Sequence, residues 1–147
     1  YGRGKAMLKA AMVLQFFLPG VPSIYYGDEA GLQGWKDPFN RRCYPWGHED
    51  QDLLQYTKTL CHLRADQPVF ARGKMELMQQ DVLGFSRWDP ETGDSVLILL
   101  NRSNTEQAIS LEDPAFAAYT VQKQLYGEQT TAIPAYGFLA FRAVRHA

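Results

Sequence analysis

The stretch PGVPSIYYGDEAG, residues 19–31, decides how the first half of the chain is read. Residues 21–26 form a short run of apolar, β-branched and aromatic side chains between proline and glycine, which predicts a buried strand. The preceding residues 4–18 are apolar on most faces and predict a helix packed against a large body. Pro19-Gly20 ends that helix. Helix, tight break and buried strand are typical of an α/β barrel or a doubly wound sheet.

A long polar and aromatic loop, residues 27–50, follows the predicted strand, and residues 51–65 predict a second helix. Loops of this length are usually functional or disordered. Four large side chains argue against disorder, namely Trp35, Phe39, Tyr44 and Trp46. Asp37, Arg41 and Arg42 lie among them, a combination that suits sugars because hydroxyls bond to charged groups and ring faces lie on aromatics. In a plainer alternative, Asp37 and Arg41 form an ion pair within the loop and the aromatic side chains cover the core.

From residue 68 onward the pattern changes, and residues 68–73 predict a domain boundary. Short strand-like segments then alternate with turns, which predicts an antiparallel β-sandwich. Residues 95–100 predict its central strand, buried on both faces. The other predicted strands are residues 74–79, 82–88, 107–111, 119–126, 130–133 and 137–144.

Composition excludes several classes of function. The 147 residues are 46% hydrophobic and 21% charged with a net charge of −1, so the chain can form a core and carries no basic surface for nucleic acid. The longest apolar stretch, residues 6–24, is interrupted by Lys9, Gln15 and two prolines, so we expect no membrane span. Cys43 and Cys61 predict two reduced thiols, which slightly favours the cytoplasm. No cysteine, histidine or carboxylate spacing predicts a metal site.

The motifs on either side of the loop resemble one known family. PGVPSIYYGDEAG resembles the segment at the last barrel strand of the α-amylase family of glycoside hydrolases. DPFNRRCYPW, residues 37–46, resembles that family's D-P-x-x-R-x-x-x-x-W stretch, and the doubled arginine points to the neopullulanase, cyclomaltodextrinase and maltogenic-amylase branch. The resemblance implies an α+β chain. Residues 1–67 would be the last helix–strand–helix of a (β/α)₈ barrel, and residues 68–147 an antiparallel β-sandwich, the domain C of that family.

The resemblance also implies a function. Members of the family are retaining hydrolases or transglycosidases of α-1,4 and, in some cases, α-1,6 glucan bonds, with an Asp nucleophile and a Glu acid/base. Those carboxylates lie in motifs upstream of residue 1, as do the family's calcium ligands, so we expect no catalytic residue, no metal site and no activity in this chain alone. The substrate of the parent protein would be an α-glucan, a maltooligosaccharide or a cyclodextrin.

Individual roles follow from the matched motif. Asp37 and Arg41 map onto residues that bind substrate, while the residues expected to form the rim or its support are Tyr26, Gly27, Asp28, Glu29, Arg42 and Trp46. Within that set, Trp46 is expected in the core and Arg42 is expected to pack and pair within the loop. Asp28 and Glu29 should point in opposite directions from a strand end, so they cannot flank one bond.

Two other classes of function stay open at this stage. The sandwich could be a stand-alone carbohydrate-binding module, with Trp88 and Tyr126 as its aromatic contacts. The chain could also belong to a non-catalytic relative, since amylase-like barrels serve as partner subunits of membrane transporters. If residues 1–67 are instead the end of a barrel, as the resemblance implies, strand 21–26 lacks both of its barrel neighbours and has unpaired edges. That predicts that the helices fold onto the sandwich or are buried against another copy of the chain.

Overall fold

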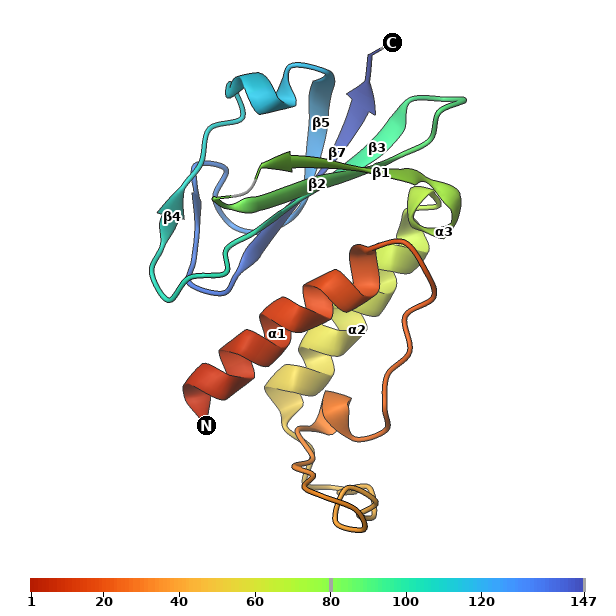
Figure 1. The fold of residues 1–147 in the computed structure, drawn as a ribbon, viewed down its shortest axis with the longest axis vertical. Helices are drawn as coiled ribbons and strands as arrows, with labels where there is room; N and C mark the ends of the chain where they lie inside the picture. The colour runs from red at the N-terminus through yellow and green to blue at the C-terminus, as the bar shows by residue number, and fades with distance from the viewer. Residues whose placement is uncertain (80, 147) are drawn as a thin grey trace.

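A computed structural model describes residues 1–79 and 81–146, and Figure 1 shows helices packed against an antiparallel sheet. The helical elements are α1 (Gly2–Phe17), η1 (Asp28–Ala30), α2 (Gln51–Asp66), α3 (Val69–Arg72) and η2 (Pro114–Phe116). The strands are β1 (Lys74–Gln79), β2 (Leu83–Trp88), β3 (Asp94–Leu100), β4 (Gln107–Ala108), β5 (Tyr119–Tyr126), β6 (Ala132–Ile133) and β7 (Phe138–Arg145).

The main sheet has five strands in the order β1-β2-β3-β7-β5, and every pairing is antiparallel. β3 lies at its centre, and all its residues after Asp94 are buried, so the predicted central strand is confirmed. A Val-Leu-Ile-Leu-Leu run has no polar face to offer to water and therefore needs cover on both sides.

β4 and β6 form a separate two-stranded sheet. The sequence predicted longer strands at residues 107–111 and 130–133, but only two residue pairs are bonded in register. The chain on either side turns away, since Ser110 begins the turn that leads to η2.

One face of the main sheet is covered by α1 and α2, which lie side by side below the sheet in Figure 1. Phe16 and Phe17 of α1, Leu60 of α2 and Phe70 of α3 share a single core with Phe85 and Ile98 of the sheet. Phe17 is fully buried, and its ring lies 4.9 Å from that of Phe70. The helices therefore fold onto the sheet, as one of the two arrangements considered above required.

The opposite face has its own smaller core. Leu97, Leu99 and Phe141 project from the sheet against Phe116 of η2 and Ile133 of β6. Alternate residues of β3 thus enter different cores, as the two-residue period of a strand dictates.

Arg87 of β2 joins the helices to the sheet from inside the core. Its side chain is 2% exposed, and its guanidinium donates to the backbone carbonyls of Phe17 (3.0 Å), Phe70 (3.1 Å) and Gly73 (2.9 Å). Burial, and then the nearby charge of Arg64, lowers the pKa of Arg87. These carbonyls belong to the last turns of α1 and α3, where helices leave oxygens without partners.

The predicted strand at residues 21–26 is wrong in this structure. The segment is extended but pairs with none of the described strands, and Val21 is 93% exposed. Within the segment, the Gln15 side chain donates to the Ser23 carbonyl, and directly before it Arg64 donates to the Gly20 carbonyl at 2.8 Å. A strand exists only where a neighbour completes its ladder, and no described segment lies there to do so. The predicted boundary at residues 68–73 holds α3.

Candidate functional site

The segment that leads through η1 to α2 carries the residues that the sequence singled out. It opens at Gly27, whose φ of 95° is left-handed and whose Cβ, if present, would lie 2.7 Å from Cδ2 of Leu32. Only glycine fits such a position without strain or clash. The Glu29 carboxylate turns back to accept from the Gly27 amide at 2.9 Å, so Glu29 supports the start of the loop.

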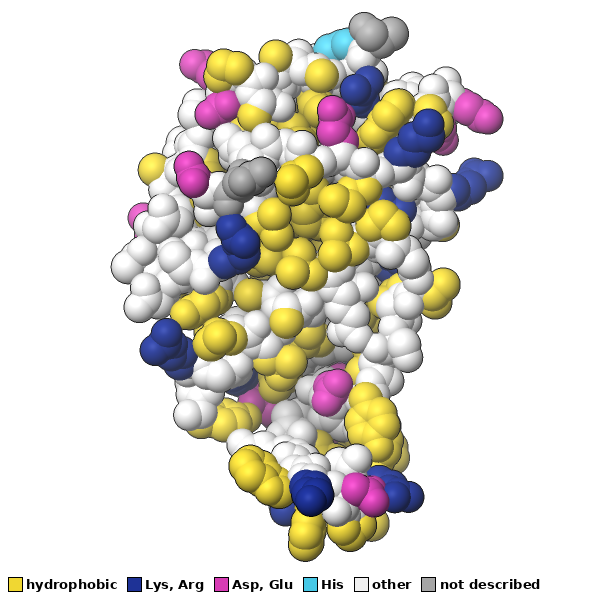
Figure 2. Space-filling view, in the orientation of Figure 1, with side chains coloured by type: hydrophobic (Ala, Val, Ile, Leu, Met, Phe, Trp, Pro, Cys, Tyr) yellow, Lys and Arg dark blue, Asp and Glu magenta, His cyan; other side chains and the backbone are white. Residues whose placement is uncertain are grey.

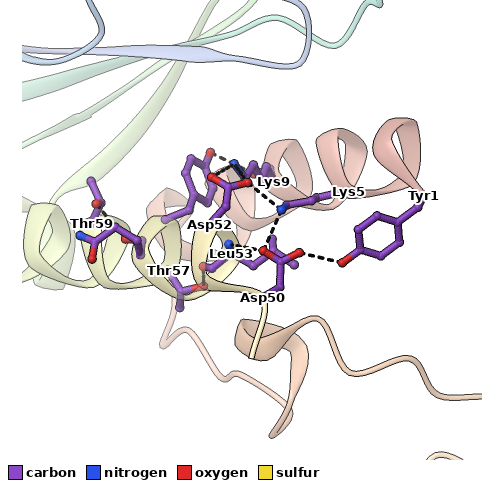
Figure 3. Close-up of polar contacts among 10 residues, drawn as sticks. Tyr1, Lys5, Lys9, Asp50, Asp52, Leu53, Thr57 and Thr59 are labelled. Carbon is purple, nitrogen blue, oxygen red and sulfur yellow. Dashed lines mark hydrogen bonds and ion pairs between the residues drawn. The ribbon is translucent and has the colours of Figure 1, made fainter. Parts of the chain in front are cut away.

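The far end of the loop returns to the same place. The Asp50 amide donates to the Ala30 carbonyl at 2.9 Å, which closes residues 31–49 into a loop whose ends touch. The Asp50 carboxylate caps α2 by accepting from the Leu53 amide at 3.1 Å. It also accepts from Lys5 and from the Tyr1 hydroxyl, each at 2.7 Å (Figure 3). These donors, led by Lys5, hold the pKa of Asp50 well below its usual range.

Asp37 and Arg41 meet at the tip of the loop. Arg41 Nε donates to Asp37 Oδ1 at 2.8 Å, and the Arg41 Nη2 atom lies 2.6 Å from the same oxygen. Two backbone bonds, Phe39 to Lys36 and Arg41 to Pro38, fold the segment between them, and the Asp37-Pro38 peptide is cis. Both charged side chains are mostly exposed. Exposed ion pairs contribute only about 0.2–1 kcal/mol, so a ligand can compete for either partner at little cost.

The same loop carries large aromatic side chains that face solvent. Trp35 is 82% exposed, Trp46 79% and Phe39 59%. At the lower end of the molecule, Figure 2 shows hydrophobic side chains interleaved with Lys or Arg and with Asp or Glu side chains. The expectation that Trp46 lies in the core is wrong. The loop projects away from α1 and α2 (Figure 1), and the ring that Trp46 contacts, Tyr44 at 4.5 Å, belongs to the same loop.

The remaining predicted residues lie at the base of the loop. The Tyr26 hydroxyl donates to the Arg42 carbonyl at 2.8 Å and ties the two arms together. Arg42 takes part through its backbone, and its side chain is exposed, so the expected packing of that side chain is not seen.

The prediction that Asp28 and Glu29 end a strand is wrong, because these residues begin the 3₁₀ turn η1. Partial burial, and then the charge of Glu29, raises the pKa of Asp28. The Glu29 carboxylate is engaged with the backbone amide of Gly27 and so has a structural role in this turn.

Other chemistry is sparse in the part of the chain that the structure describes. Cys43 and Cys61 are both free and exposed. Residues 1–79 and 81–146 contain no group of three His, Cys, Asp or Glu side chains placed to hold a metal ion. No helix in these ranges is long and apolar enough to cross a membrane.

Sequence reasoning did not find Lys5 and Tyr1 as anchors of the loop. Both lie more than 40 residues from Asp50 in the sequence, and no local pattern links them to it. Asp50 itself could have been recognised, because an Asp directly before a predicted helix is a common cap.

The fold has clear counterparts among solved structures. The crystal structure of a maltogenic amylase from S. marinus superposes with a TM-score of 0.79 and 31% identity, over 97% of this chain and 20% of that one. No protein-family profile matches the chain.

Relatives found by sequence comparison are also enzymes named for α-glucan substrates or products. An amylopullulanase of Thermoanaerobacter thermohydrosulfuricus is 39% identical over 119 residues, 74% of this chain and 8% of the relative. A cyclomaltodextrinase of Geobacillus thermopakistaniensis is 31% identical over 148 residues, 91% of this chain and 25% of the relative. The chain therefore belongs to the α-amylase family of glycoside hydrolases. It spans a quarter or less of the length of these relatives.

Proposed function

We propose that this chain is the C-terminal part of a retaining α-glucan hydrolase or transglycosidase, and that it contributes one wall of the sugar-binding cleft. The bonds cleaved would be α-1,4 links, with α-1,6 links as a second candidate. Residues 1–67 would belong to the end of the catalytic barrel and residues 68–147 to domain C. The relatives are named for pullulan-, cyclomaltodextrin- and maltose-linked activities, which supports this substrate class.

The observation that carries the proposal is the Asp37–Arg41 pair at the exposed tip of an anchored loop. Its carboxylate and guanidinium can bond to vicinal sugar hydroxyls, and the neighbouring indole and phenyl rings offer faces for the sugar ring. In this proposal the catalytic carboxylates are supplied by the rest of the parent protein, so the chain alone turns over no substrate.

The first test uses the full-length parent protein. Hydrogen bonds to charged groups are worth about 1.5–3 kcal/mol, so Asp37→Ala and Arg41→Ala should each lower kcat/KM on maltooligosaccharides roughly 10- to 100-fold. Arg42→Ala is the matched control, because Arg42 directly follows Arg41, its side chain is exposed, and its hydrogen bond to Tyr26 is made by the backbone. If all three variants have the same kcat/KM, the Asp37–Arg41 pair does not bind substrate.

The second test uses the chain alone. We expect no release of reducing sugar from maltooligosaccharides, pullulan or cyclodextrins. Measurable turnover by the purified 147-residue chain would overturn the division of labour proposed here. Reading the upstream coding sequence separates an enzyme, with three acidic motif residues, from a non-catalytic relative that lacks them.

A further inference from the structure

A second concave surface lies far along the chain from the loop. It is a groove of about 480 Å³ where β5 ends, β7 begins and the small β4–β6 sheet approaches. The residues that matter for its chemistry are Glu106, Tyr126, Glu128, Gln129 and Phe138. Its volume falls within the range of small-molecule sites, which is roughly 300–1,000 Å³.

The floor of the groove is aromatic and rigid. The ring of Tyr126 stacks on that of Phe138 with centroids 4.1 Å apart and planes 4° from parallel. Tyr56 of α2 meets Phe138 edge-on at 6.4 Å, and Phe138 is buried. One face of the Tyr126 ring is thus held by the core, while Tyr126, which is only partly buried, lines the groove. A fixed aromatic surface of this kind costs little ordering when a flat apolar ligand face binds it.

The rim of the groove is polar, and its backbone conformation is fixed without a ligand. Glu106 and Glu128 are exposed, and Gln129 lies beside them. Gly127 forms the turn with a φ of 109°, and a Cβ there would lie 2.2 Å from Cδ2 of Leu139. The Gln124 amide donates to the carbonyls of Tyr126 (3.3 Å) and Gln129 (3.0 Å), which fixes the turn from inside.

The charges of the groove select the class of ligand. Glu106 and Glu128 line it, and no Lys or Arg does so in the described ranges, which disfavours an anion. Burial, and then the charges of Asp52 and Glu128, raises the pKa of the Tyr126 hydroxyl, so that group is a neutral donor and acceptor. Carboxylates that accept, an amide and a phenol that donate, and an aromatic floor together match the hydroxyls and the ring face of a neutral sugar.

We infer that this groove is a second glucan-binding site, in which a glucose unit lies over Tyr126 and its hydroxyls donate to Glu106 and Glu128. The choice of an α-glucan as ligand rests on the proposed function. Such a site would hold a polymer near the cleft by raising its effective concentration, and it needs no catalytic group.

The test is titration of the 147-residue chain with maltoheptaose, followed by calorimetry and by amide chemical shifts in NMR. We expect saturable shifts at Gly127, Gln129 and Gly137, and at least a tenfold weaker affinity in the double variant Glu106→Ala/Glu128→Ala. Both side chains are exposed, so this variant should fold normally. Glu91→Ala/Glu112→Ala is the control of equal charge, on exposed sites that do not line the groove, and should bind as the wild type does.

Two further arms separate the groove from the loop. Asp37→Ala should leave the groove shifts unchanged. If Asp37→Ala abolishes maltoheptaose binding and Glu106→Ala/Glu128→Ala does not, the groove is not a glucan site. The proposed function would then still stand. Groove shifts caused by tetramethylammonium but not by maltoheptaose would overturn the sugar assignment. If the groove binds maltoheptaose but Asp37→Ala leaves the kinetics of the parent protein unchanged, the proposed role of the loop is refuted instead.

Discussion

Arg87 offers the sharpest test of how the helices are held to the sheet. Arg87→Met keeps the length of the apolar stem but removes every donor, which leaves the carbonyls of Phe17 and Gly73 without this partner. Phe70 retains a bond from Arg64 at 3.2 Å. Each buried acceptor that loses its donor costs about 1–3 kcal/mol, and removing the cost of burying the guanidinium offsets part of the sum. We therefore expect a loss of about 2–4 kcal/mol.

The assay is urea unfolding of the chain followed by far-UV circular dichroism. With an m-value of about 2 kcal/mol per molar urea, the predicted loss lowers the midpoint by about 1–2 M. Arg87→Lys keeps the charge but offers a single compact donor group, so it should lose about half as much. Because Arg87→Lys is the milder change, it keeps the test valid even if Arg87→Met fails to fold.

Lys58→Met serves as the control, since Lys58 lies exposed on α2. A surface substitution of this kind should change stability by less than about 0.5 kcal/mol. If Arg87→Met unfolds at the same urea concentration as Lys58→Met, the three-way bridge between α1, α3 and β2 carries no weight, and the reasoning above is refuted.

Three more outcomes are expected. The pKa of Asp50 is lowered in the folded chain, so its contribution to stability is complete above the ordinary pKa of an Asp and is lost as the pH falls through the lower folded value. The difference in urea midpoint between wild type and Asp50→Asn should therefore be large at neutral pH and disappear in acid. A difference that does not change with pH would contradict this. Gly27→Ala should destabilise the chain by at least about 1 kcal/mol more than Gly47→Ala in thermal unfolding, because both sites have positive φ but only the first lacks room for a Cβ; equal losses would show that the contact at Gly27 relaxes freely. Trp46→Ala should cost less than about 0.5 kcal/mol, against about 3–5 kcal/mol for Phe17→Ala, and a large loss at Trp46 would place its indole back in the core.

Local pattern was sufficient for most of the secondary structure. The predicted bounds of β1 and β5 agree with the structure, and those of α1, α2, β2, β3 and β7 differ by one or two residues. These segments carry strong signals: proline and glycine at their ends, an Asp cap before α2, and an unbroken apolar run in β3. The ion pair of Asp37 with Arg41, which the plainer alternative predicted, is confirmed, and the two residues lie only four positions apart in the chain.

Other features depended on what surrounds each residue in space. The run at residues 21–26 has the composition of a buried strand, yet Val21 is exposed because composition supplies side chains and not a neighbouring backbone. Trp46 is apolar but 79% exposed, on a loop that projects away from α1 and α2 (Figure 1).

The sequence by itself determined most of the helices and main-sheet strands of this protein, the family to which it belongs and the charged pair at the tip of its loop, since each depends on residues close together in the chain. Only the tertiary structure decided that Lys5 anchors Asp50, that Arg87 joins α1 and α3 to β2, and that Tyr126 and Glu106 line one groove. Contacts between residues 17 to 70 positions apart leave no periodic trace, because they arise from how finished helices and strands pack.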